Sequence, residues 1–83
     1  MKHNTRASFW HSLERLPAEI QELAHKNFKL MQADERHASV RLKKVGQLWS
    51  ARVGEHYRAL AKQTDVGLVW FWIGPHHEYD KYL

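Results

Sequence analysis

Six consecutive apolar residues, Leu68 to Ile73, are the feature that most constrains the fold of this chain. A run of this length and composition is typical of a strand covered on both faces, and it is far shorter than the roughly 18 to 20 apolar residues that cross a bilayer. We therefore expect an interior strand of a sheet. Strand alternation places Trp70 and Trp72 on one face and Val69, Phe71 and Ile73 on the other.

Two more segments before this run have the composition of strands. They are QLWSARVG (47–54) and HYRALAKQT (56–64), and turn signals of the types GE and DVG separate them from each other and from the apolar run. The pattern predicts two consecutive hairpins in a small antiparallel sheet. The tryptophans then belong to the core of the domain, because base stacking would need them exposed.

The first part of the chain follows a helical period instead. Its apolar residues recur in two groups, at 9, 13 and 16 and at 20, 23, 24, 28 and 31, with Pro17 suited to the first turn of the second helix. The first helical segment could also begin with an extended piece at residues 2–6. We expect an α+β fold in a single domain spanning 1–83, with two N-terminal helices on one sheet face and a short C-terminal tail or helical turn.

Charge and composition narrow the class of protein. The chain has 83 residues, no cysteine and a net charge of +4, and residues 41–62 hold six basic residues against one acidic residue, a local charge of +5. Such a block attracts a polyanion or an acidic protein. With no signal-peptide or membrane-spanning segment, we expect a cytoplasmic protein whose site is a shallow surface groove.

The first candidate site is the hairpin WSARVGEHYRAL. A three-residue loop at 54–56 would place Arg52 directly across from Arg58, a repulsive pair that a bound anion would relieve, whereas a two-residue loop would turn them to opposite faces. The sequence leaves both registers open. It also allows Arg58 to be tied to Glu78 or Asp80 at the chain end.

The second candidate site is the polar tail that follows the apolar run. It contains His76, His77, Tyr79 and Tyr82, which together with an arginine can move protons and stabilise charge at a phosphate. RNA could be cut this way through its own 2′-hydroxyl. Neither a metal set nor a nucleotide-cofactor motif occurs, so we expect no metal and no cofactor.

The order of these segments resembles the RelE/ParE superfamily of toxins from bacterial type II toxin–antitoxin systems. The resemblance runs from LPAEIQELAHKNFKLM through VRLKKVGQLWSARVGEHYRAL to GLVWFWIGPHHEYDKYL, and it is closest to short RelE-like translational repressors. It implies a RelE/ParE-like fold with a basic groove and an acidic antitoxin as partner. Within this pattern, Arg58 matches the family's strand arginine, His76 falls where some members have arginine, and Tyr82 falls near the terminal tyrosine.

The resemblance leaves more than one activity open. RelE-type members cut mRNA on the ribosome and block translation, which predicts an endoribonuclease with Arg58, His76, His77 and Tyr82 as catalytic residues and with RNA-binding residues Lys43, Lys44, Arg52 and Tyr79. Which histidine or tyrosine is the acid or base stays open. ParE-type members instead inhibit DNA gyrase without catalysis, and a third alternative is an inactive homologue that binds its antitoxin.

Overall fold

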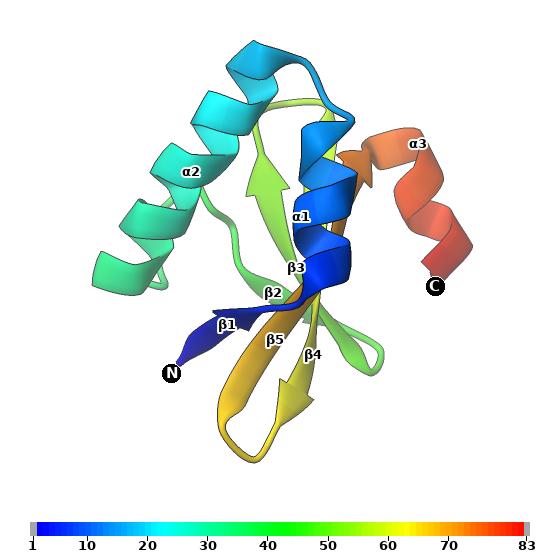
Figure 1. Ribbon diagram of the computed structural model, residues 1–83. Helices are drawn as coiled ribbons and strands as arrows, with labels where there is room; N and C mark the ends of the chain where they lie inside the picture. Colours follow the sequence, from blue (N-terminus) through cyan, green and yellow to red (C-terminus); the bar gives the residue numbers. More distant parts are fainter. Residues whose placement is uncertain (1, 83) are drawn as a thin grey trace.

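A computed structural model describes residues 2–82 of the chain, and Figure 1 shows the arrangement of its helices and strands. In chain order the elements are β1 (His3–Thr5), α1 (Ala7–Glu14), α2 (Ala18–Ala33), β2 (Lys43–Val45), β3 (Leu48–Val53), β4 (Tyr57–Thr64), β5 (Gly67–Pro75), α3 (His76–Tyr79) and the 3-10 helix η1 (Asp80–Tyr82). The described helices are all too short or too polar to pass through a lipid bilayer.

The strands form one sheet of five, in the order β1-β5-β4-β3-β2. The two predicted hairpins are confirmed as β3-β4-β5, and β5 lies inside the sheet as its apolar run requires. Two short strands complete the sheet. β1 pairs in parallel with Leu68–Trp70 of β5, and β2 pairs antiparallel with β3, so the sheet is mixed rather than wholly antiparallel.

The helices α1 and α2 pack on one face of the sheet, while α3 lies at the end of β5 and contacts β4 and β5 (Figure 1). The helix-side core combines Phe9 and Leu13 of α1 and Ala24 and Met31 of α2 with alternate residues of the strands. This two-layer arrangement confirms the expected α+β fold. The sheet face away from the two helices is called the open face below.

The predicted faces of the two central tryptophans are wrong, because β5 contains a bulge. Leu60 pairs with Trp72 and Ala61 pairs with Trp70, so Phe71 has no partner in β4. An extra residue on one strand reverses the alternation of the residues beyond it. Trp70 therefore lies in the helix-side core, 2% exposed, whereas Trp72 shares the open face with Leu60.

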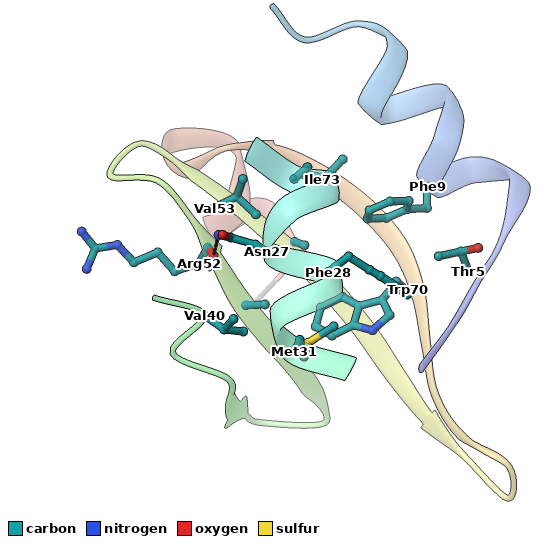
Figure 2. A pocket seen from close by; sticks show the side chains of 13 residues that line it. Thr5, Phe9, Asn27, Phe28, Met31, Val40, Arg52, Val53, Trp70 and Ile73 are labelled. Atoms are coloured by element: carbon teal, nitrogen blue, oxygen red, sulfur yellow. Dashed lines mark hydrogen bonds between the residues drawn. The ribbon is translucent and has the colours of Figure 1, made fainter. Parts of the chain in front are cut away.

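A polar contact joins α2 to the sheet beside the apolar core. Asn27 is 7% exposed, and its Nδ2 donates to the carbonyl oxygen of Arg52 at 3.1 Å. Figure 2 shows Asn27 directed at this backbone, above a cavity of about 30 Å³ lined mainly by apolar side chains. The cavity is only large enough for water, and the Arg52 side chain points away from it, so it is not a ligand site.

His3 holds the edge strand β1 against the core. Its side chain is 1% exposed, its Nδ1 accepts a hydrogen bond from Trp70 Nε1 at 3.2 Å, and its Nε2 lies 3.9 Å from Glu35 Oε1. Burial lowers the pKa of His3, and the charge of Glu35 opposes that shift. The neutral ring is thus the form that fits, since the indole N–H is always a donor.

This environment predicts an acid-sensitive fold. The unfolded chain takes up a proton on His3 at a higher pH than the folded chain, so the unfolding free energy falls as the pH drops below about 6.5 and stops falling below the folded-state pKa. The variant His3→Asn keeps an acceptor for Trp70 without a titrating ring. Chemical denaturation across this pH range should show that the unfolding free energy falls more steeply with decreasing pH in the parent than in His3→Asn. Equal dependence on pH in the two proteins would contradict this role of His3.

Candidate functional site

The β3–β4 hairpin has the three-residue loop, which settles the register that the sequence leaves open. Val53 pairs with Tyr57, and Arg52 lies directly across from Arg58 on the open face. Gly54 opens the loop with a φ of 67°, a left-handed conformation that glycine adopts without strain. The two guanidinium groups then take different partners, since Arg52 Nε donates to the carbonyl oxygen of Gly54 at 2.9 Å.

Arg58 belongs to a compact group with His76 and Tyr79, which we call the Arg58 cluster. Arg58 Nε donates to His76 Nδ1 at 3.4 Å, and the guanidinium carbon lies 5.8 Å from the centre of the Tyr79 ring. The His76 ring stacks on the same tyrosine, with 5.5 Å between the centroids and 19° between the planes. Tyr79 is 6% exposed, so a buried ring supports an arginine and a histidine at the surface.

The start of α3 brings this cluster together. The His76 backbone N–H donates to the carbonyl oxygen of His56 at 2.7 Å, which ties the beginning of α3 to the β3–β4 loop. The segment is a helical turn, which is one of the two alternatives expected for the end of the chain. The alternative in which Arg58 is tied to Glu78 or Asp80 is wrong, because no carboxylate within residues 2–82 lies at ion-pair distance from Arg58.

The hydrogen bond from Arg58 identifies Nδ1 as the accepting nitrogen of the His76 ring. An arginine Nε–H is only a donor, so Nδ1 of His76 holds a lone pair and the proton of the neutral ring is on Nε2. The terminal amino groups of Arg58 make no hydrogen bond to any other part of the described chain. The cluster thus presents free guanidinium donors next to a basic ring nitrogen, an arrangement suited to a phosphate group.

Tyr82 and His77 are placed differently from each other. The Tyr82 ring packs on Trp72 with 4.8 Å between centroids and stays 44% exposed, whereas His77 is exposed and outside the Arg58 cluster. Trp72 in turn lies over Gly74, where a Cβ atom would collide with the indole, and Gly74 is the residue across from Arg58. A series of contacts through Trp72 and Gly74 therefore links Tyr82 to Arg58.

Sequence reasoning missed Trp72 and Gly74 as parts of this site, because it placed Trp72 in the core. A signal was present, since a glycine within a strand often marks the close approach of another group. The glycine that follows the apolar run is the position over which the indole lies, and it is the residue across from Arg58.

The predicted RNA-binding lysines fall on opposite faces. Lys43 pairs with Ser50 and shares the open face with Arg58, whereas Lys44 pairs with Trp49 and lies on the helix side. Alternation along a strand forces this separation. Of the basic block, Lys43, Arg52, Arg58 and Lys62 thus share the open face.

A surface groove of about 350 Å³ runs beside the cluster, between the end of α1 and the C-terminal segment. Trp72 and Tyr82 line it, Arg15 and Lys81 add two positive charges to its walls, and Glu78 adds one negative charge. Within residues 2–82 no three histidine, aspartate or glutamate side chains lie close enough together to hold a metal ion. The groups in and beside the groove are cations, aromatic rings, the carboxylate of Glu78 and the imidazole of His76, whose Nδ1 accepts a hydrogen bond from Arg58.

A profile of the ParE-like toxin domain matches residues 18–81 of the chain, which include α2 and every residue of the Arg58 cluster. The chain belongs to the ParE-like toxin family. No curated protein sequence gives a comparable match to this toxin.

Solved structures show the same fold for toxins of the RelE and ParE types. A chain of the RelB–RelE antitoxin–toxin complex from Methanococcus jannaschii superimposes with a TM-score of 0.73 at 14% identity, covering 96% of the toxin and 98% of that chain. The YoeB/ParE toxin from Agrobacterium tumefaciens superimposes with a TM-score of 0.68 at 18% identity, covering 92% of this chain and 99% of that chain. A chain of the RelBE2 toxin–antitoxin complex from Mycobacterium tuberculosis superimposes with a TM-score of 0.66 at 16% identity, covering 90% of this chain and 96% of that chain.

The stack on Tyr79 predicts a difference between two variants of the toxin. Tyr79→Phe keeps the ring and should preserve both stability and the position of His76, whereas Tyr79→Leu should lower the unfolding free energy by about 1 to 3 kcal/mol. The ring-current shift of the His76 imidazole protons, read by NMR, should persist in Tyr79→Phe and vanish in Tyr79→Leu. A shift that survives in Tyr79→Leu would contradict the stacked arrangement.

Proposed function

We propose that this toxin is an mRNA endoribonuclease that blocks translation by cutting RNA at the Arg58 cluster, without a metal ion. The observation that carries the proposal is the free guanidinium of Arg58 beside the basic Nδ1 of His76, both held on Tyr79. A phosphodiester needs positive charge at its non-bridging oxygens and a base near its 2′-hydroxyl. The Arg58 cluster supplies both functions with two adjacent side chains.

The chemistry needs no nucleophile from the protein. The terminal amino groups of Arg58 bind the phosphate. This binding moves the guanidinium and breaks its hydrogen bond to His76, so that Nδ1 of His76 can accept the proton of the 2′-hydroxyl. The 2′-oxygen then attacks phosphorus and the bond from phosphorus to the 5′-oxygen breaks. The leaving 5′-oxygen takes a proton from Tyr82 or from water, and the first product ends in a 2′,3′-cyclic phosphate.

Charge on the open face supports RNA as the ligand. Arg52 lies directly across from Arg58 in the sheet register, while Lys62 lies four residues further along β4 and Lys43 lies on β2. The groove walls add Arg15 and Lys81. Together these cations can follow a phosphate backbone across the face and into the groove, which favours binding through counterion release. Lys44 lies on the other face and contributes only to the general field.

The partner that we propose is an acidic antitoxin that covers the open face. The net charge of +4 favours an acidic protein, and two of the matching structures are complexes of antitoxin with toxin. An antitoxin that occupied the Arg58 cluster would exclude RNA from it. The proposed setting for both partners, and for mRNA on the ribosome, is the cytoplasm.

A second function is inhibition of DNA gyrase, and the match to a ParE-like domain favours it. In that case the open face binds gyrase, and the Arg58 cluster has no catalytic role. Inhibition of supercoiling by purified gyrase, without any RNA cleavage, would support this alternative.

Inducible expression in bacteria tests the nuclease directly. The parent should arrest growth and produce new mRNA 5′ ends, and Arg58→Ala should lower the cleavage rate by about 100-fold or more because it removes charge at the transition state. His76→Ala should cause a loss of at least similar size. Lys29→Ala is the matched control, since it removes one exposed positive charge from α2 on the helix side.

The outcomes separate the alternatives. New mRNA ends that disappear in Arg58→Ala and persist in Lys29→Ala would support the nuclease. Growth arrest without new ends would overturn it in favour of a protein target such as gyrase, and no arrest at all would indicate an inactive homologue that only binds its antitoxin.

A further inference from the structure

We propose that Ser8 is a positioning residue for the C-terminal part of the site, because its hydroxyl group holds the bulge of β5 in place. Ser8 lies in the first turn of α1, and its Oγ donates to the carbonyl oxygen of Phe71 at 2.8 Å. The two residues are 63 positions apart in the sequence. A side chain of the first helix thus fixes the strand that leads into the Arg58 cluster.

The bulged residue has no strand partner on either side. Phe71 lacks a pairing residue in β4, and β1 ends one residue earlier, with Thr5 across from Trp70. The backbone N–H of Arg6 closes the pairing of β1 by donating to the carbonyl oxygen of Trp70 at 2.9 Å. The Ser8 hydroxyl therefore continues, from a helix, the row of donors that β1 supplies up to that point.

This hydrogen bond selects a register of β5. It lies at the surface, where water can satisfy the Phe71 carbonyl in any arrangement of the strand, whereas a hydroxyl on α1 is in place only for a bulge at Phe71. A bulge displaced along β5 would change the face on which Trp72 lies, because a shift of one residue reverses the alternation. Ser8 thus favours the register that places Trp72 over Gly74.

The residue that Ser8 holds also contacts Tyr82. The rings of Phe71 and Tyr82 meet edge-on with 6.1 Å between their centroids, and the Trp72 ring lies 4.8 Å from the same tyrosine. Successive residues of a regular strand point to opposite faces, so the bulge is what lets both rings contact Tyr82. The inference rests on the proposed nuclease only in its last step, where Tyr82 gives a proton to the leaving 5′-oxygen.

The test compares Ser8→Ala and Ser8→Thr with the parent, in the full chain, by NMR. One α-proton of Gly74 points at the Trp72 indole, so its resonance reports the position of that ring. In Ser8→Ala this resonance should move toward that of a glycine with no ring beside it. Amide protection from hydrogen exchange in residues 71–74 should fall by about 2- to 12-fold, the factor that corresponds to one net hydrogen bond. Ser8→Thr keeps a hydroxyl and should retain the parent values.

Helix propensity works against these predictions, which makes the pair of variants informative. Alanine is a better helix former than serine and threonine a slightly poorer one, so an effect of α1 itself would favour Ser8→Ala over Ser8→Thr. Ser12→Ala is the matched control, because it removes a hydroxyl from the same helix that donates to the Ser8 carbonyl oxygen. It should leave the Gly74 resonance and the protection of residues 71–74 as in the parent.

The location of the lost protection separates a register effect from a general loss of stability. Protection should fall in residues 71–74 and stay at the parent value in the other half of the hairpin, where residues 62–64 pair with 67–69. An equal fall in both halves would overturn the proposal. So would parent-like behaviour of Ser8→Ala, or a loss in Ser8→Thr as large as in Ser8→Ala.

Cleavage of RNA gives a second readout, which a general structural role would not produce. Ser8→Ala should lower kcat and leave KM unchanged, because it misplaces a group that acts after RNA has bound. In a Tyr82→Phe background the same substitution should lower kcat no further, since the hydroxyl that it positions is already absent. An equal loss in both backgrounds would contradict positioning through Tyr82.

The two readouts distinguish failure of this inference from failure of the nuclease. A chain that shows the predicted NMR pattern but cuts no RNA would refute the nuclease and leave the role of Ser8 at the bulge standing. Cleavage of RNA by a chain without the NMR pattern would refute the role of Ser8 and leave the nuclease standing.

Discussion

The bulge at Phe71 in β5 is the constraint on which both faces of the sheet depend. Because the register shifts between Leu60 and Ala61, one strand sends Trp70 into the helix-side core and Trp72 onto the open face. The first tryptophan donates a hydrogen bond to His3 of β1, which secures the edge of the sheet. The second lies over Gly74 and beneath Tyr82, which places the C-terminal segment beside Arg58.

The sequence predicts much of the fold for identifiable physical reasons. Helical spacing of apolar residues indicates α1 and α2, and an uninterrupted apolar run indicates the interior strand, because both signals come from burial along a regular element. The short strands β1 and β2 have only three residues each, too few to show an alternation. The face of Trp72 was mispredicted because a bulge depends on the partner strand and leaves no periodic signal in the sequence.

The candidate site could be predicted only in its parts. Arg58 and the tail histidines were recognised from their chemistry, and the three-residue loop was one of two registers that the sequence allowed. The partner of Arg58 was not predictable, because it depends on α3 folding back from Pro75 and on the bond from His76 to the β3–β4 loop. Opposite charge made Glu78 or Asp80 one alternative partner for Arg58. The helical turn instead places the imidazole of His76 and the ring of Tyr79 against the guanidinium.

The chemistry of the product ends tests cleavage at the Arg58 cluster most directly. An mRNA with a single 2′-deoxy substitution at the cut position and its unmodified counterpart can be incubated with purified toxin in a translation extract, and the fragments analysed by mass spectrometry. We predict a 2′,3′-cyclic phosphate on the upstream fragment and a 5′-hydroxyl on the downstream one, with no cut in the substituted RNA. Fragments with a 3′-hydroxyl and a 5′-phosphate, or equal cutting of both RNAs, would contradict attack by the 2′-hydroxyl.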